Sequence, residues 1–148
     1  MFSLPAVRIL FDTNVLIDAA VSSRQYHDVS FELFDRCVQG QIDGILAPVS
    51  VATCWYVATN TYEVDPRPMY EYLKPNLTLA RMGWPAVEQA LKTDREAHFS
   101  GVTFEDQFLS IAGMHAGATV VATRNEQDFQ GGALSPHHPA DLISMFRS

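Results

Sequence analysis

Short apolar runs bounded by polar or turn residues predict the strands of this chain. Arg8-Ile9-Leu10-Phe11 ends at an aspartate, Gly44-Ile45-Leu46-Ala47 ends at a proline, and Thr119-Val120-Val121-Ala122 leads into a polar segment. Continuous apolar runs of this length are typical of parallel strands buried on both faces. Residues 77–82 show the alternation of a further strand. The pattern therefore predicts a mostly parallel sheet.

Between these runs, apolar residues recur at helical spacing. We expect helices over Val15 to about Ala20, Tyr26–Gln39, Pro48 to about Asn60, Pro68–Leu73, Trp84–Lys92 and Phe104–His115. Strands that alternate with helices form βαβ units, whose helices cover both faces of the sheet. The predicted fold class is therefore α/β, and its ligands should gather at the carboxyl ends of the strands.

Length and composition support one folded unit. The chain has 148 residues, of which 47% are hydrophobic and 18% charged. These values are those of a globular protein and exclude a disordered or collagen-like chain. We expect residues 1–148 to form a single domain.

The net charge of the chain limits how it can bind nucleic acid. Ten Lys and Arg against 17 Asp and Glu give a net charge of −7. Binding to phosphate backbones through charge alone is therefore disfavoured. Any contact with nucleic acid should be local and assisted by a metal ion.

The cysteines and apolar stretches bear on location. Cys37 and Cys54 lie in apolar surroundings without Cys-x-x-Cys spacing, which predicts buried free thiols instead of a zinc or redox site. The first residues lack a basic region followed by an apolar run, and no apolar stretch approaches the roughly 18 residues that span a bilayer. We expect a cytoplasmic protein with no membrane partner.

Three polar segments stand where a parallel sheet collects its site. Asp12-Thr13-Asn14 follows the first strand, Phe104-Glu105-Asp106 opens the long helix, and residues 123–129 follow the last predicted strand. Carboxylates gathered at one edge repel each other unless cations lie between them, and hard oxygen ligands select Mg²⁺ or Mn²⁺. Such a site activates water for phosphodiester hydrolysis.

Each acid also has a structural interpretation. Asp12 suits the N-cap of the following helix, and Thr103 with Asp106 and Thr123 with Glu126 resemble capping boxes. Glu105 and Asp18 are most simply solvated helix positions. Taken singly, an acid of this kind is more often a cap or a surface group than a metal ligand. The predicted convergence of these acids at one edge of the sheet favours the metal-ligand interpretation.

The three segments resemble the signature blocks of PIN-domain proteins. The blocks are Ile9–Asp18, Phe104-Glu105-Asp106 with the helix after it, and Val121–Asn125 with Asp128-Phe129. The correspondence runs from about residue 7 to 144. It implies a three-layer α/β/α sandwich and Mg²⁺- or Mn²⁺-dependent ribonuclease activity. The family includes VapC-type toxins, so the resemblance also implies an RNA substrate, an antitoxin partner and a homodimer.

The resemblance assigns roles residue by residue. Asp12, Asp106 and Asp128 become catalytic metal ligands, and Asn125 completes or orients their shell. Asn14, Thr123 and Arg124 become contacts to the substrate, although Arg124 suits the screening of carboxylate repulsion equally well.

The helix after the second strand departs from the family. Members usually carry an acid where this chain has Thr53, within Ser50-Val51-Ala52-Thr53-Cys54. Because threonine is a poor cation ligand, this change leaves open a single metal ion, a slow enzyme or a site without catalysis.

Other candidate residues have plainer explanations. His137-His138 lies between two prolines without a paired acid or thiol, which favours an exposed turn over a metal site. Trp55, Tyr56 and Trp84 are expected in the core or at a dimer contact more than against bases. Aromatic residues on the helices, including Phe31, Phe34 and Tyr62, exceed what one small sheet needs, which also predicts a homodimer.

Three functions remain as hypotheses. The first is a metal-dependent endoribonuclease, the toxin of a toxin–antitoxin pair. The second is a degenerate PIN-like module that binds or regulates with weak or no nuclease activity, which Thr53 favours. The third, a phosphatase with Asp12 as nucleophile, is weaker because Asn14 stands where that chemistry needs a second Asp.

Overall fold

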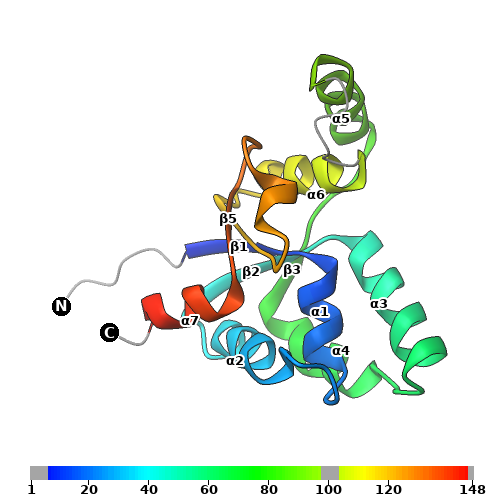
Figure 1. The fold of residues 1–148 in the computed structure, drawn as a ribbon, viewed down its shortest axis with the longest axis vertical. Helices are drawn as coiled ribbons and strands as arrows, with labels where there is room; N and C mark the ends of the chain where they lie inside the picture. The colour runs from blue at the N-terminus through cyan, green and yellow to red at the C-terminus, as the bar shows by residue number, and fades with distance from the viewer. Residues whose placement is uncertain (1–6, 98–103, 147–148) are drawn as a thin grey trace.

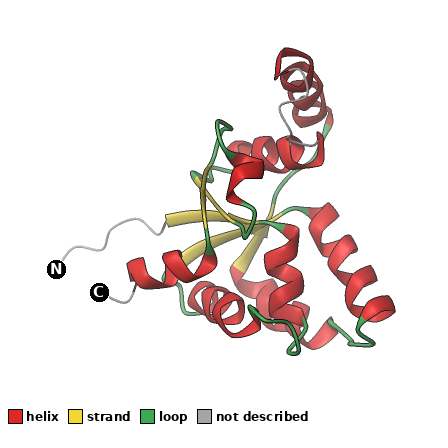
Figure 2. Cartoon of the chain, in the orientation of Figure 1, coloured by secondary structure: helices red, strands yellow, loops and turns green. Residues whose placement is uncertain are grey.

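A sheet forms the centre of the described part of the protein (Figure 2). Its five strands are parallel and lie in the order β3-β2-β1-β4-β5. The structure is a computed structural model that describes residues 7–97 and 104–146. The strands are β1 (Val7–Phe11), β2 (Ile42–Leu46), β3 (Leu77–Leu79), β4 (Val120–Ala122) and β5 (Ser135–His137). The order reverses direction between β1 and β4, so the sheet has its topological switch point there.

Helices cover both faces of this sheet (Figure 1). The helices are α1 (Thr13–Ala20), α2 (His27–Val38), α3 (Pro48–Thr61), α4 (Arg67–Leu73), α5 (Trp84–Ala97), α6 (Phe104–His115) and α7 (Pro139–Phe146), with 3₁₀ turns η1 (Lys74–Asn76) and η2 (Glu126–Phe129). Helices α1, α2 and α7 lie on one face, and α6 with α5 beyond it lies on the other. This arrangement is the predicted three-layer α/β/α sandwich.

The central strand shows why both faces need a cover. Side chains alternate along a strand, so Ile9 and Phe11 enter the core under α1 and α2, while Leu10 enters the core under α6. All three are fully buried. Phe11 stacks on Phe34 of α2 with ring centroids 4.1 Å apart. The continuous apolar run is thus explained by burial on two sides.

Most predicted elements are confirmed, and the differences are local. The three strands expected from apolar runs form β1, β2 and β4, and the six predicted helices form α1 to α6. Their ends shift by a few residues, and α5 runs on to Ala97 instead of ending at Lys92. The strand expected over residues 77–82 is shorter. It ends at Leu79, although the Ala80 amide still donates to the Leu46 carbonyl at 2.8 Å.

The final strand and helix were not predicted. Strand β5 is Ser135-Pro136-His137, and it pairs with β4 at the edge of the sheet. Helix α7 begins directly after it at Pro139. A proline inside a three-residue strand hides the strand signal, because proline is tolerated only where no ladder hydrogen bond is needed.

Several side chains test the simpler expectations. Cys37 and Cys54 are free and buried, as predicted, and burial raises the pKa of the Cys37 thiol to about 12. The expectation of core or dimer positions for the aromatic residues is wrong as regards the core: Tyr56 is 66% exposed and Trp84 75% exposed. No helix in the described ranges is both long and apolar enough to cross a membrane.

Candidate active site at the switch point of the sheet

The candidate site begins where β1 and β4 end. Asp12 directly follows β1, and its amide donates to the carbonyl of Ala122 at the end of β4, at 2.9 Å. Thr123 follows β4, and its amide donates to the His137 carbonyl at 2.9 Å. These bonds fix two polar residues side by side at the switch point, where α/β sheets bind their ligands.

The Asp12 carboxyl group is held by two hydrogen bonds. Its Oδ1 accepts from the Thr13 amide at 2.8 Å, and its Oδ2 accepts from the Thr123 hydroxyl at 2.9 Å. The first bond makes Asp12 the N-cap of α1, as the capping interpretation predicted. The second bond comes from a residue 111 positions away and is no part of a cap. The carboxyl group is therefore oriented by the sheet as well as by its own helix.

The pKa of Asp12 is raised, from 3.8 to about 6. Burial is the main cause, since Asp12 is only 5% exposed and burial disfavours the charged form. The hydrogen bonds from Thr123 and Thr13 oppose this rise, and the negative charges of Asp106 and Asp128 add to it. Asp12 is thus close enough to both acids to feel their charges, and a cation would relieve all of these effects.

Asp106 and Asp128 reach this region from different elements. Asp106 lies in the first turn of α6 and Asp128 lies in η2, and both are half-buried. Their carboxylate oxygens have the hard donor chemistry that suits Mg²⁺ or Mn²⁺. In the described residues, however, no three His, Cys, Asp or Glu side chains are grouped closely enough to form a ready metal shell. The donor types fit the cation, and binding would have to draw the carboxyl groups closer.

Helix α3 brings a hydroxyl group against Thr13, the residue after Asp12. The Ser50 hydroxyl, fully buried, lies 2.7 Å from the Thr13 hydroxyl. Thr53 lies three residues further along α3, hence on the same helix face, and is half-buried. The position at which the family carries an acid is therefore adjacent to the turn that holds Asp12.

The predicted substrate contacts lie at different depths. Asn14, in the first turn of α1, and Asn125, at the N-cap of η2, are half-buried. Thr123 has no exposed surface, and its hydroxyl donates to Asp12 and accepts from the Asn125 amide at 2.9 Å. The Thr123 hydroxyl therefore orients the Asp12 carboxyl group, and a contact of Thr123 with a substrate stays a prediction. Thr123 also does not serve as a helix cap, and Thr103 of the other predicted capping box lies outside the described residues.

Asp18 was wrongly predicted to be a solvated helix position. It is 1% exposed and accepts from the Nε atoms of Arg24 and Arg124, each at 2.6 Å. Arg124 therefore contacts Asp18 rather than the carboxyl group of Asp12. Glu105, the other residue with this interpretation, is exposed as predicted. Asp18 can be buried because Arg24, in a loop, and Arg124, far along the chain, pair with it. The helical spacing of residues around Asp18 does not reveal these partners.

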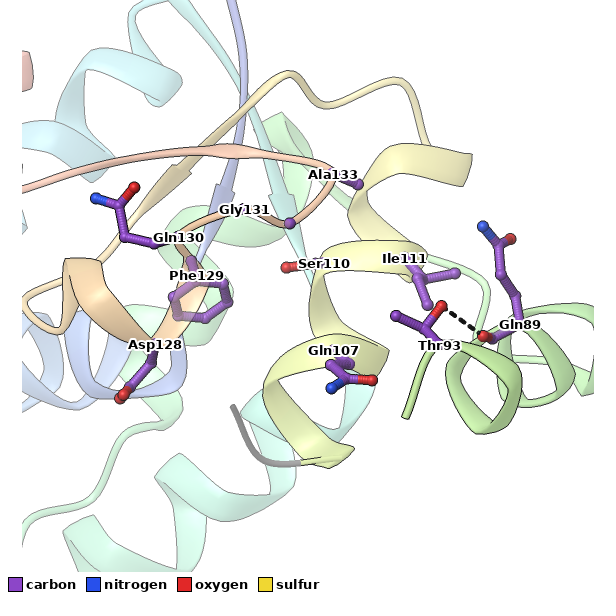
Figure 3. Close-up of a pocket in the computed structure, with 11 residues that line it drawn as sticks. Gln89, Thr93, Gln107, Ser110, Ile111, Asp128, Phe129, Gln130, Gly131 and Ala133 are labelled. Carbon is purple, nitrogen blue, oxygen red and sulfur yellow. Dashed lines mark hydrogen bonds between the residues drawn. The ribbon is translucent and has the colours of Figure 1, made fainter. Parts of the chain in front are cut away.

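A pocket of about 220 Å³ lies beside Asp128, between η2, α5 and α6 (Figure 3). Gln107 and Ser110 of α6 line it opposite Gln130 and Gly131. Gln107 is 8% exposed, and its Oε1 has no hydrogen-bond partner. The pocket opens next to an acid of the candidate site and adds polar atoms that the sequence did not single out.

The histidine pair is neither exposed nor part of a metal group in the described chain. His137 belongs to β5 and its Nε2 lies 3.0 Å from the Ser135 hydroxyl. The Nδ1 of His138 accepts from the Ala140 amide at 3.0 Å, at the start of α7. Both are half-buried, which corrects the prediction of an exposed turn. His138 immediately precedes the helix that the sequence pattern missed and accepts from its first turn.

Comparisons with known proteins show a likeness at the level of the fold. No protein-family model matches the chain, and no curated protein matches it. Among solved structures, the chain is similar to one described as a toxin–antitoxin complex from Klebsiella pneumoniae, with a TM-score of 0.64 and 17% sequence identity. The similarity covers 88% of this chain and 97% of that chain. At this identity the likeness concerns the fold.

Proposed function

We propose that this protein is a Mg²⁺- or Mn²⁺-dependent endoribonuclease. The proposal depends mainly on the Asp12 carboxyl group, which is buried at the switch point of the sheet. Burial and the charges of Asp106 and Asp128 raise its pKa to about 6. A carboxyl group with a strongly raised pKa among other acids is typical of a catalytic or cation site. The bound ion would activate water and stabilise the charge of the phosphodiester transition state.

The protein's own residues would position this chemistry. Thr123 and the Thr13 amide fix the direction of the Asp12 carboxyl group, and Asp106 and Asp128 supply the further oxygen donors. Asn125 stands at the start of η2 and orients the turn that carries Asp128, whose amide donates to the Asn125 carbonyl at 3.0 Å. In an acidic chain, such a cation would make the local field at these carboxylates attractive to an RNA phosphate.

The biological role we propose is that of a toxin with a protein antitoxin. Two independent facts support it: the resemblance of the three sequence blocks to VapC-type toxins, and the similar fold of a chain from a toxin–antitoxin complex. We also propose a homodimer, for which exposed aromatic residues of α3 such as Trp55 and Tyr56 offer apolar surface. Sedimentation at micromolar concentration would then give a mass above the 16.5 kDa of one chain.

A degenerate binding module is the second candidate. Thr53 in place of an acid favours it, as does the lack of a ready three-ligand group in the described residues. The two candidates differ in their response to a metal ion, because a degenerate module should neither bind Mn²⁺ through Asp12 nor cleave RNA.

The test is cleavage of a structured RNA by the native chain with Mn²⁺ and with excess chelator. We expect slow cleavage that yields discrete internal fragments and stops on chelation. Asp12→Asn, prepared identically, identifies cleavage by a contaminating nuclease. Equal fragments from both proteins, or cleavage that survives the chelator, would contradict the proposal.

A further inference from the structure

A second polar pocket, of about 270 Å³, is lined by Arg124, the residue that follows Thr123 of the candidate site. Its lining includes Asp18, Arg24, Tyr26, Tyr62 and Arg124, which we call the arginine pocket. The Asp18 side chain is 2% exposed, and it accepts from the Nε atoms of both arginines at 2.6 Å. A buried carboxylate thus holds two guanidinium groups together.

Each guanidinium group keeps an amino group for a ligand. Arg24 uses Nε on Asp18 and Nη1 on the Tyr62 hydroxyl at 2.8 Å. Arg124 uses Nε and Nη2 on Asp18. Within residues 7–97 and 104–146, no protein atom accepts from Arg24 Nη2 or Arg124 Nη1. The two side chains are 19% and 23% exposed, so the arginine pair is partly open to solvent.

The arginines are also fixed by aromatic rings. Arg24 lies over the Tyr62 ring at 5.5 Å and Arg124 over the Tyr26 ring at 5.4 Å, both in cation–π geometry. With Asp18 as the single acid among these residues, the cluster carries a charge of +1 in a chain whose net charge is −7. Little side-chain entropy remains to be lost when an anion binds such a rigid pair.

Two segments of the chain connect the arginine pocket to the candidate active site. Arg124 directly follows Thr123, which donates to Asp12. Asp18 lies six residues after Asp12 along α1, an axial distance of about 9 Å at about 1.5 Å per residue. That separation corresponds to roughly two or three phosphate steps of a stacked strand at about 3.4 Å each.

We propose that the arginine pocket binds a backbone phosphate of the RNA strand, about two or three nucleotides away from the phosphodiester that lies at Asp12. The inference rests on the proposed function. A guanidinium fork matches phosphate oxygens in planar geometry. The connection of Arg124 to Asp12 through Thr123 suits a continuous strand better than an unconnected anion. An acidic segment of a protein partner is the competing occupant, and the test separates the two.

The experiment measures binding of a fluorescein-labelled single-stranded oligoribonucleotide by anisotropy at several salt concentrations. The protein carries Asp12→Asn, so that the RNA is not cut, and chelator is present. Arg24→Gln and Arg124→Gln should each weaken binding about tenfold and lower the salt slope by about 0.7. Arg8→Gln is the matched control, because Arg8 is also ion-paired, to Asp43 at 2.8 Å, but lies at the opposite end of β1.

Removing one arginine leaves Asp18 with one partner, which can impair folding. The double variant Asp18→Asn/Arg124→Gln removes the buried charge together with its partner and should show the same loss of RNA affinity. Native affinity and slope in Arg24→Gln, Arg124→Gln and the double variant would overturn the inference. Loss of binding to labelled oligoglutamate with unchanged RNA binding would overturn it in favour of an acidic protein partner.

The proposed function can fail separately. If the native chain does not cleave RNA with Mn²⁺ but arginine-dependent binding persists, the proposed nuclease activity is wrong. RNA binding by the arginine pocket is then still supported. If cleavage depends on Asp12 but the arginine variants bind RNA normally, the nuclease stands and the arginine pocket does not.

Discussion

Replacing Asp12 by Asn is expected to yield a protein that is inactive on RNA yet more stable than the native chain without metal. Asn keeps the size of the side chain, and its Oδ1 can still accept from the Thr13 amide. The Thr123 hydroxyl, which now donates, can instead accept from the Asn amide group. The substitution removes a buried charge and little else, and loss of the first carboxylate should lower cleavage at least about a hundredfold.

The gain in stability should depend on pH in a defined direction. The folded carboxyl group has a pKa of about 6, against an ordinary value of 3.8. Between these pH values the folded protein binds the proton that the unfolded chain has released, so the native chain loses stability as pH rises through this window. A pKa difference of this size corresponds to about 3 kcal/mol at most. Asp12→Asn lacks the titrating carboxyl group, so its free energy of unfolding should not fall as pH rises through this window.

Thermal or urea unfolding at pH 4 and pH 7 in chelator checks this expectation. The two proteins should differ little at pH 4, and the Asn variant should be more stable at pH 7. Asp28→Asn, an exposed carboxyl in the first turn of α2, serves as the control and should show no such gain. A native chain that is as stable as Asp12→Asn at pH 7 would refute the account of a strained buried charge.

Replacing Thr53 by Glu should have the second large effect. Thr53 lies one turn beyond Ser50, whose hydroxyl contacts Thr13 next to Asp12, so a longer acidic side chain there can reach the carboxylate region. A further hard oxygen donor should raise the affinity for Mn²⁺ at least about tenfold and increase the cleavage rate. Without metal, the added negative charge should lower the melting temperature, because it faces other carboxylates.

Thr53→Gln is the matched control for this prediction. It has the same length as Glu and carries no charge, so it should change neither Mn²⁺ affinity nor cleavage rate appreciably. Mn²⁺ titrations and initial cleavage rates at equal protein concentration measure both effects. A fully active native chain that is indifferent to Thr53→Glu would show that another residue supplies the missing donor.

The sequence predicts well those features that depend on neighbouring residues. The apolar run Arg8–Phe11 ending at Asp12 predicts both the central strand and the position of the acid, because strand burial and capping are local patterns. The switch point between β1 and β4 follows less directly, since it depends on the order in which strands pair. Strand β5 escaped prediction because its proline obscures the pattern.

Features that depend on distant partners were missed. The burial of Asp18 requires Arg24 and Arg124, and the latter lies 106 residues away. The hydroxyl contact between Thr13 and Ser50 likewise joins two helices. The sequence pattern therefore predicts a solvated Asp18, whereas in the fold its carboxylate pairs with two arginines. A buried acid facing the carboxyl ends of the strands is a signal only once the topology is known.

We propose that Asp12, Asp106 and Asp128 together hold a divalent cation. Calorimetric titration of Mn²⁺ into the native chain and into Asp12→Asn, Asp106→Asn and Asp128→Asn tests it most directly. Glu105→Gln, an exposed acid next to Asp106, is the control. The account predicts that the native chain and the control bind Mn²⁺ alike and that each of the three Asn variants binds it at least about tenfold more weakly. Equal Mn²⁺ binding in the native chain and the three Asn variants, or no binding to the native chain, would contradict it.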